Sequence, residues 1–288
     1  MKYAFIQAHQ AEFRLCAMLR VFGVSASGYH AWRTRRPHRA RRAETQEAWE
    51  ARVRTTFEAC RSRYGSPRLT HELRAQVGAV SERHVAETMR ELGLRARGAR
   101  RFMATTNSKH SLSVSPNLLN QDFSAEAINQ KWVGDITYLW TEEGWLYLAT
   151  MIDVHSRAVI GWSMAAEMTA ELACSALRMA LTARGNPTGV IVHSDRGSQY
   201  CSHAYQALIT AAQLRGSMSA KGNCYDNAMA ESFFHSLKVE DTHGRKVSTR
   251  AEMRAIVFEY IEVFYNRTRR HSALGYISPE QFEAQQLA

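Results

Sequence analysis

Residues 131–164 read KWVGDITYLWTEEGWLYLATMIDVHSRAVIGWSM and carry the strongest fold signal in the chain. Three runs rich in β-branched and aromatic residues, at 131–139, 144–154 and 157–164, are separated by short turns at 142–144 and 155–156. Runs of this length and spacing are typical of strands that pair with their neighbours in sequence. The stretch therefore predicts a three-stranded antiparallel meander.

The residues after the meander alternate between helix and strand patterns. Residues 169–184 repeat apolar side chains at helical spacing, and GVIV at 189–192 has the length of a short buried strand. A helix at 203–213, a strand at 214–219 and two further helices complete this half. Three strands followed by alternating helices and strands predict an α/β fold, a mixed sheet with helices on its faces.

The first half of the chain is predicted to be all-α. Two pairs of helical segments are each interrupted by a glycine, Gly23 and Gly78, and Ser81 can cap the last helix. This helix-turn-helix signal is weak alone, because any helical hairpin has the same pattern. We expect five regions: a first helix-turn-helix-like basic region (1–60), a second helix-turn-helix-like region (61–105), a linker (106–130), an α/β core (131–245) and a C-terminal helical extension (246–288).

The charge of the chain is unevenly divided. Residues 1–130 contain 22 Lys and Arg against 11 Asp and Glu, whereas residues 131–288 contain 15 against 16. Arg33, Arg35 and Arg36 belong to a dense run of arginines after the first helix pair. A basic half joined to a near-neutral half favours a polyanionic partner, above all nucleic acid, over a merely solvated basic surface.

Composition excludes several classes of protein. With 45% hydrophobic and 22% charged residues, the chain has the composition of a protein with a sizeable core. No apolar run approaches the ~20 residues of a membrane span, and residues 1–15 lack the apolar centre of a signal peptide. The five cysteines are scattered without a C-x-x-C pair, which argues against a disulfide framework or a zinc site. We expect a cytoplasmic, nucleoid-associated protein with no membrane partner.

Three carboxylates form a candidate site. Asp135 interrupts an apolar strand, Asp195 follows the strand at 189–192, and Glu231 lies on the polar face of a helix. Each alone has a simple explanation as a strand-end hydrogen bond, a turn cap or a solvated side chain. Together, in a chain with a basic half, they indicate a hard cation such as Mg²⁺ or Mn²⁺, which prefers oxygen ligands. Two such ions ~4 Å apart can activate the attacking oxygen and stabilise the leaving oxygen in phosphodiester chemistry.

The motifs around these acids resemble a known family. The segments WVGDITY, HSDRGSQY and DNAMAESFFHSLKVE are similar to the DDE signature of insertion-sequence transposases related to retroviral integrases. The 35 residues between Asp195 and Glu231 give the spacing of the DD(35)E pattern. The segments RVFGVSASGYHAWRTRRP, VSERHVAETMRELGLRA and FYNRTRRHSALGYISPEQF extend the resemblance over nearly the whole chain. The most similar group is the second-frame (OrfB) product of elements whose full transposase arises by frameshifting.

The resemblance implies a ribonuclease-H-like integrase catalytic core in which Asp135, Asp195 and Glu231 are the catalytic residues and the metal ligands. It implies two Mg²⁺ ions, for which Mn²⁺ can substitute. The implied activity is that of a DNA transposase, which cleaves the ends of an insertion sequence and joins the freed 3′-hydroxyl to a phosphodiester. In this group one end is first joined to the same strand near the other end, which gives a circular intermediate. Asp153, another acid at a strand end, is then structural.

The expected partners are double-stranded DNA, as terminal inverted repeats and as target, and further copies of the chain in a homodimer or higher multimer. Candidate DNA contacts outside the arginine run share a basic or imidazole side chain near the catalytic helix or in the C-terminal cluster: Lys238, Arg267, Arg269, Arg270 and His271. An ordinary solvated lysine and a charge cluster at a helix C-terminus are the alternatives.

One departure from the family concerns the upstream first-frame segment, which carries a further helix-turn-helix and a heptad zipper. No heptad run is present here, so the first-frame product is a further expected partner. The alternative function is a DNA-binding accessory subunit that depends on that product for catalysis. A structure-specific nuclease of the same fold is a third hypothesis, which the two helix-turn-helix candidates disfavour.

Overall fold

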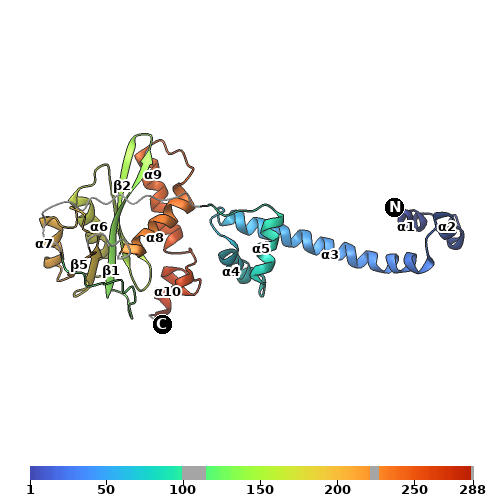
Figure 1. Cartoon of the computed structure of the whole chain (residues 1–288), viewed down its shortest axis with the longest axis horizontal. Coiled ribbons are helices and arrows are strands. Elements are labelled where there is room, and N and C mark those ends of the chain that lie inside the picture. The colour runs from blue at the N-terminus through green and yellow to red at the C-terminus, as the bar shows by residue number, and fades with distance from the viewer. Residues whose placement is uncertain (99–114, 221–226, 287–288) are drawn as a thin grey trace. The chain divides into compact units, whose positions relative to one another are not determined.

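The structure is a computed structural model that describes residues 1–98, 115–220 and 227–286, with residues 36–43 described by their backbone alone. The chain divides into two compact units, Met1–Arg95 and Ala96–Ala288. The first unit contains helices only among its described residues, and the second is built on a five-stranded sheet (Figure 1). No helix in the described part of the chain is both long enough and apolar enough to span a membrane.

The first unit begins with a small helical core. Its helices are α1 (Lys2–Ala8), α2 (Leu15–Phe22), α3 (Ala26–Ala59), α4 (Ser66–Val77) and α5 (Glu82–Glu91). Helix α2 ends at Gly23, whose positive φ of 60° suits glycine, and the Ser25 hydroxyl accepts a hydrogen bond from Gly28 N at the start of α3. Ile6 and Tyr29, which are both fully buried, join these helices into one core.

Helix α3 differs from the prediction, because it continues through the arginine run to Ala59. Its second half packs on α4 and α5, where Trp49 stacks on His84 at 5.0 Å and donates a hydrogen bond to Thr88 Oγ1 at 2.9 Å. The predicted Ser81 cap is present, since the Ser81 hydroxyl accepts from His84 N. The region boundary expected at residue 60 stays a prediction.

The second unit contains the predicted antiparallel meander. Its strands are β1 (Lys131–Thr141), β2 (Gly144–Asp153), β3 (Val159–Ala165), β4 (Ile191–Ser194) and β5 (Arg215–Met218), in the order β3-β2-β1-β4-β5. The β1–β2 and β2–β3 pairs are antiparallel, whereas β4 pairs parallel with both β1 and β5. The meander and the mixed sheet are therefore confirmed, with the fourth strand two residues later than expected.

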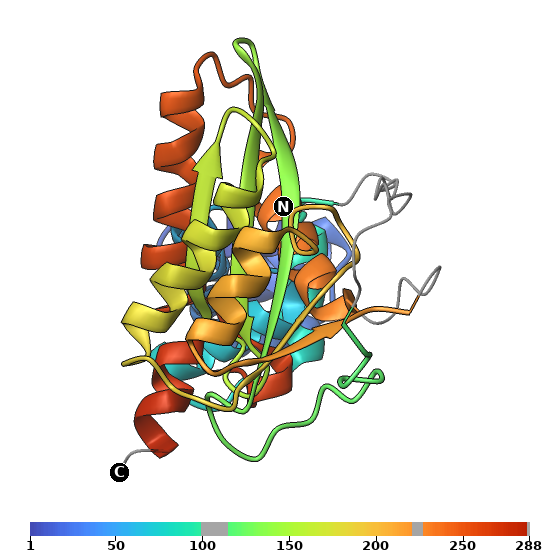
Figure 2. The same ribbon diagram turned by 90° about the vertical axis from the view of Figure 1, so that its left-hand side faces the viewer.

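Helices cover both faces of this sheet (Figure 2). They are α6 (Ala170–Ala183), α7 (His203–Ala211), α8 (Ala228–Leu237) and α9 (Arg250–Phe258), then the π-helical turns η2 (Lys238–Thr242) and η3 (Glu259–Tyr265), the short η4 (Ser272–Leu274) and α10 (Pro279–Gln286). Alternate residues of β1 enter two cores: Trp132 packs with α6 and α7, and Val133 packs with α8 and α9. The α6 side requires a glycine in β3, because a Cβ at Gly161 would clash with the backbone of Ala176 and Ala180.

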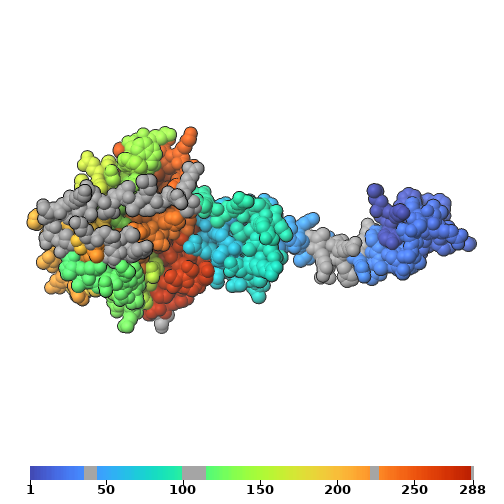
Figure 3. Space-filling model, viewed as in Figure 1, coloured from blue at the N-terminus to red at the C-terminus, as the bar shows by residue number. Residues whose placement is uncertain are grey.

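Residues 115–130, predicted as part of a linker, pack on the second unit. Leu119 is buried, and the Leu118 and Leu119 amides donate to Ser217 Oγ beside β5 at 2.9 and 3.3 Å. Figure 3 shows the green residues before β1 on the surface of this unit. The remainder of the expected linker, residues 106–114, lies outside the described residues.

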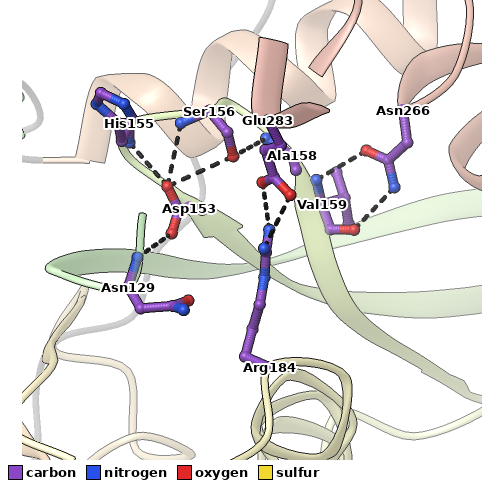
Figure 4. A network of polar contacts seen from close by, with 9 residues as sticks. All are labelled: Asn129, Asp153, His155, Ser156, Ala158, Val159, Arg184, Asn266 and Glu283. Carbon is purple, nitrogen blue, oxygen red and sulfur yellow. Dashed lines mark hydrogen bonds and ion pairs between the residues drawn. The ribbon is translucent and has the colours of Figure 1, made fainter. Parts of the chain in front are cut away.

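Asp153, at the end of β2, is fully buried and its carboxylate is surrounded by hydrogen-bond donors (Figure 4). Its carboxylate accepts from Asn129 N at 2.8 Å, from His155 N at 2.9 Å, and from the backbone and hydroxyl of Ser156 at 3.1 and 3.4 Å. A carboxylate whose oxygens already accept four donors organises the chain around it. This geometry supports a structural role for Asp153.

Two contacts fasten the C-terminal residues to the rest of the second unit, one to strand β3 and one to the end of α6 (Figure 4). The Asn266 side chain accepts from Val159 N and donates to Val159 O, both at 2.9 Å, and so satisfies the backbone of the outer strand β3. Arg184, which follows α6, forms a two-pronged ion pair with Glu283 of α10. The C-terminal extension is thereby part of the second unit.

Candidate active site

Asp135 of β1 and Asp195, the first residue after β4, come at the same level of two neighbouring parallel strands. In the parallel β1–β4 pair Val133 is opposite His193, so each aspartate comes two residues beyond a paired position. Asp135 accepts a hydrogen bond from Ile136 N at 2.8 Å, and Asp195 accepts one from Gly197 N at 2.9 Å in the loop after β4. The carboxyl end of a parallel strand thus brings the second acid to the first, as expected at this edge of a sheet.

Glu231 comes from α8, which packs its aromatic face on the sheet. Phe233 and Phe234 are buried in the core shared with β1, while Glu231 is exposed on the opposite side of the helix. The predicted amphipathic pattern is therefore present. Asn227, the residue just before the helix, is buried.

Electrostatics link the three acids. Burial raises the pKa of Asp135 well above its usual range, and the negative charges of Asp195 and Glu231 raise it further. The Ile136 amide and the Lys238 ammonium act in the opposite direction. Loss of hydration also raises the pKa of Glu231. A site that holds several carboxylates against their mutual repulsion is suited to a cation.

Lys238 accompanies the acids. Its ammonium lies 5.0 Å from the centre of the Tyr138 ring, on the strand that carries Asp135. Burial lowers the pKa of Lys238, and the Asp135 charge partly offsets this effect. Lys238 is thus a cation beside Asp135.

The donor set fits a hard cation. Asp135, Asp195 and Glu231 offer carboxylate oxygens, and no cysteine or histidine is needed to complete the set. Among the described residues, no three His, Cys, Asp or Glu side chains are gathered as closely as the ligands of a metal ion. The three acids are therefore neighbours, but they are not as close together as the ligands of a bound metal ion.

Tyr200 also lies near the acids, although the sequence did not mark it as a candidate site residue. Its side chain is buried, and within the described residues its hydroxyl has no hydrogen-bond partner. Burial raises its pKa, and the charges of Asp135 and Asp195 contribute. Its place in HSDRGSQY, five residues after Asp195, was the only available signal.

The predicted DNA contacts fall into two groups. Arg33 and Arg35 are exposed on α3, and the side chain of Arg36 lies outside the described residues. Arg267 is also exposed and is 3.8 Å from Glu280. Arg270 is partly buried and donates to Tyr276 O at 2.9 Å.

The predictions for Arg269 and His271 need correction. Arg269 is 3% exposed and pairs with Glu240 through Nε and Nη2, at 2.8 and 2.6 Å. His271 is 9% exposed, and its ring lies 3.2 Å from Arg269 Nη1. Both side chains are enclosed by protein, so they are not surface groups for phosphate. A cluster of basic residues in the sequence does not show that one of them pairs with a buried acid, Glu240, 29 residues earlier.

Comparison with known proteins agrees with this architecture. Residues 125–224 and 231–287 match two family models that are both described as integrase core domain, and residues 44–102 match an HTH-like domain. The transposase InsF of insertion sequence IS3A from Escherichia coli (strain K12) is 56% identical over 288 residues, 100% of both chains. An uncharacterized 31 kDa protein of insertion element IS600 from Shigella sonnei is 46% identical over 265 residues, 92% of this chain and 97% of its own.

Solved structures are more distant. A chain of the simian T-cell lymphotropic virus intasome, solved with a PP2A regulatory subunit, is 16% identical with a TM-score of 0.46, over 76% of this chain and 70% of its own. The HTLV-2 integrase catalytic core, solved with magnesium, is 17% identical with a TM-score of 0.42, over 56% of this chain and 99% of its own. With a full-length relative at 56% identity and two integrase-core matches, the chain belongs to the DDE transposases of IS3-type insertion sequences.

Proposed function

We propose that this transposase cuts the ends of its insertion sequence and joins the freed 3′-hydroxyl to a phosphodiester by two-metal-ion chemistry, with Asp135, Asp195 and Glu231 as the catalytic acids. The observation that carries the proposal is the placement of these three acids: Asp135 and Asp195 each lie two residues beyond a paired position of β1 and β4, and Glu231 lies on α8, which packs on β1. Three acids from separate elements are costly to bring together unless a cation or a reacting group uses them.

The acids would hold two Mg²⁺ ions, or Mn²⁺ in their place. Bound metal supplies charge that activates an attacking oxygen and stabilises a leaving one. The protein itself orients the carboxylates and keeps other groups from pairing with them. Asp135 and Asp195 are fixed by amide donors, and Lys238 supplies a positive charge toward the phosphate oxygens.

DNA would be held mainly by cations on the surface. Arg33 and Arg35 in the first unit and Arg267 in the second are exposed and can meet phosphates. We propose double-stranded terminal repeats and target as the DNA partners, a homodimer or higher multimer as the acting form, and the nucleoid as its location. Two ends joined in one event favour at least two copies.

A strand-joining assay with labelled terminal-repeat DNA tests the chemistry. The full chain is compared with Asp135→Asn and Asp195→Asn, in Mg²⁺ and in EDTA. Metal-dependent joining that both substitutions abolish is the expected result. Joining in EDTA, or joining retained by either variant, would refute the proposal.

The assay also separates the second candidate function. If the chain binds its terminal repeats but joins them only after the first-frame product is added, it acts as a dependent subunit. The exposed arginines of α3 favour DNA binding in either case.

A further inference from the structure

The C-terminal end of α8 is tied to a buried arginine. Arg269 Nη2 donates to Ser236 Oγ, one residue before the end of α8, at 3.1 Å. The same guanidinium donates to both carboxylate oxygens of Glu240, in the turn η2 that continues α8. One planar group therefore fixes the helix and the turn that follows it.

The arginine is itself held from several sides. Glu240 also accepts from the Tyr260 hydroxyl at 2.8 Å, and the Arg269 guanidinium lies 5.4 Å from the centre of the Tyr265 ring. Tyr265 packs edge-on against Phe233 of α8 at 4.8 Å. Burial acts to lower the pKa of Arg269, but its hydrogen bonds and attraction to Glu240 outweigh burial and raise it, so Arg269 stays charged.

The two segments held by this cluster carry two groups of the active site. Glu231 lies on α8, five residues before Ser236, and Lys238 lies in η2, two residues before Glu240. A helix transmits a displacement of its end along its length, because its hydrogen-bond ladder is stiff. A change in the hydrogen bonds from Arg269 to Ser236 and Glu240 would therefore shift Glu231 and Lys238 together.

We propose that Arg269 is a positioning residue that sets the place of Glu231 and Lys238 relative to Asp135, through Ser236 and Glu240. The inference rests on the proposed function for the role of those groups. It assigns to the C-terminal extension a part in building the active site, in place of the DNA contact expected for Arg269.

A merely stabilising ion pair is the competing explanation, and the chain offers a matched control for it. Arg184 and Glu283 also form a two-pronged and largely buried pair, but they join the end of α6 to α10. Among the described residues, neither Arg184 nor Glu283 forms a hydrogen bond or ion pair with α8 or η2. A buried pair can often be replaced by uncharged groups with little loss of stability, whereas removal of one partner is costly.

The test therefore removes both charges of a pair at once. The double variant Arg269→Met with Glu240→Gln, which keeps an acceptor for Tyr260, is compared with Arg184→Met with Glu283→Gln in the full chain. Thermal unfolding, Mn²⁺ affinity by electron paramagnetic resonance without DNA, and the kcat and KM for strand joining are measured. Ser236→Ala, which deletes a single hydrogen bond and suits a helix, serves as the mild variant.

The expected result is a folded Arg269/Glu240 variant with Mn²⁺ affinity and kcat lowered about tenfold, the range for groups that orient metal ligands, and with an unchanged KM for DNA. The control variant should match the wild type in Mn²⁺ affinity and kcat, and Ser236→Ala should show a smaller loss in both. Wild-type Mn²⁺ affinity in a folded Arg269/Glu240 variant would overturn the inference, as would equal losses in the control. If that variant does not fold, wild-type Mn²⁺ affinity in Ser236→Ala would overturn it. Because Mn²⁺ binding is measured without joining, failure of the wild type to join DNA would refute the proposed function alone.

Discussion

At the scale of single residues, Asp135 and Asp153 show how two acids in neighbouring strands come to have different surroundings. Asp153 accepts four hydrogen bonds from its surroundings. Asp135 accepts one from Ile136 N and is close enough to Asp195 and Glu231 for their charges to raise its pKa. The fold supplies Asp153 with its hydrogen-bond donors. It destabilises the charged form of Asp135, so that this carboxylate is available to a cation.

The raised pKa of Asp135 predicts how stability depends on pH. A folded state that raises the pKa of an acid binds more protons than the unfolded state between the ordinary and the raised value. The metal-free protein should therefore lose stability as pH rises through that window, and Mg²⁺ should restore stability above it. Thermal unfolding in EDTA and in Mg²⁺ measures both effects. Asp135→Asn should be more stable than the wild type in EDTA above the window; a variant with the wild-type pH profile would contradict this explanation.

Asp153→Ala should destabilise the second unit without altering the chemistry. The substitution leaves four donors, two of them buried and two partly buried, without their acceptor, and we expect a loss of about 2–4 kcal/mol in the free energy of unfolding. Chemical denaturation gives the loss, and strand joining is then measured at a temperature where the variant is folded. Complete loss of joining in the folded variant would show that Asp153 belongs to the active site.

The sequence allowed the acids to be predicted and the buried arginine to be missed for a physical reason. Asp135, Asp195 and Glu231 lie inside strong local patterns, a strand, a loop after a strand and an amphipathic helix. The pairing of Arg269 with Glu240 is made by tertiary packing of η3 and the residues after it against η2. No local pattern records such a pair, so NRTRRH looked like a surface cluster.

At the scale of elements, the packing of α6 on the outer strand β3 depends on one missing side chain. A Cβ at Gly161 would meet backbone atoms of α6, which cannot rotate away as a side chain could. Gly161→Ala should therefore force the helix from the strand and cost about 1–3 kcal/mol. Denaturation midpoints check the value, with Gly98→Ala as the control, because no atom of the described residues lies within 4 Å of a Cβ there. Equal stability of the two variants would show that α6 can shift freely.

Elements with their own sequence signal were predicted well. The meander has period-two patterning and short turns, and α8 has a clear apolar face. The length of α3 was not predicted, because Ala, Arg and Glu favour helix without marking where it ends. The π-helical turns η2 and η3 give no recognisable period, and they hold Glu240, Tyr260 and Tyr265, which surround Arg269.

At the scale of the whole molecule, the uneven charge predicts where DNA affinity resides. Replacing Arg33 and Arg35 by alanine in the full chain should weaken binding to all DNA sequences alike. The slope of log K against log salt should fall by about two, because each phosphate contact contributes ~0.9. Binding titrations over a range of salt concentrations measure this, with exposed Arg178 and Arg215 of the second unit as the control pair. An unchanged slope would place the DNA contacts elsewhere.

The central claim is that this transposase joins DNA with metal held by Asp135, Asp195 and Glu231. The most direct test is Glu231→Gln, since Glu231 is exposed and its replacement leaves the core around Phe233 intact. Joining of labelled terminal-repeat DNA is measured in Mg²⁺ for the wild type and the variant, with DNA affinity as the check on folding. We expect metal-dependent joining by the wild type and none by a variant that still binds DNA. Joining by Glu231→Gln at the wild-type rate would contradict it.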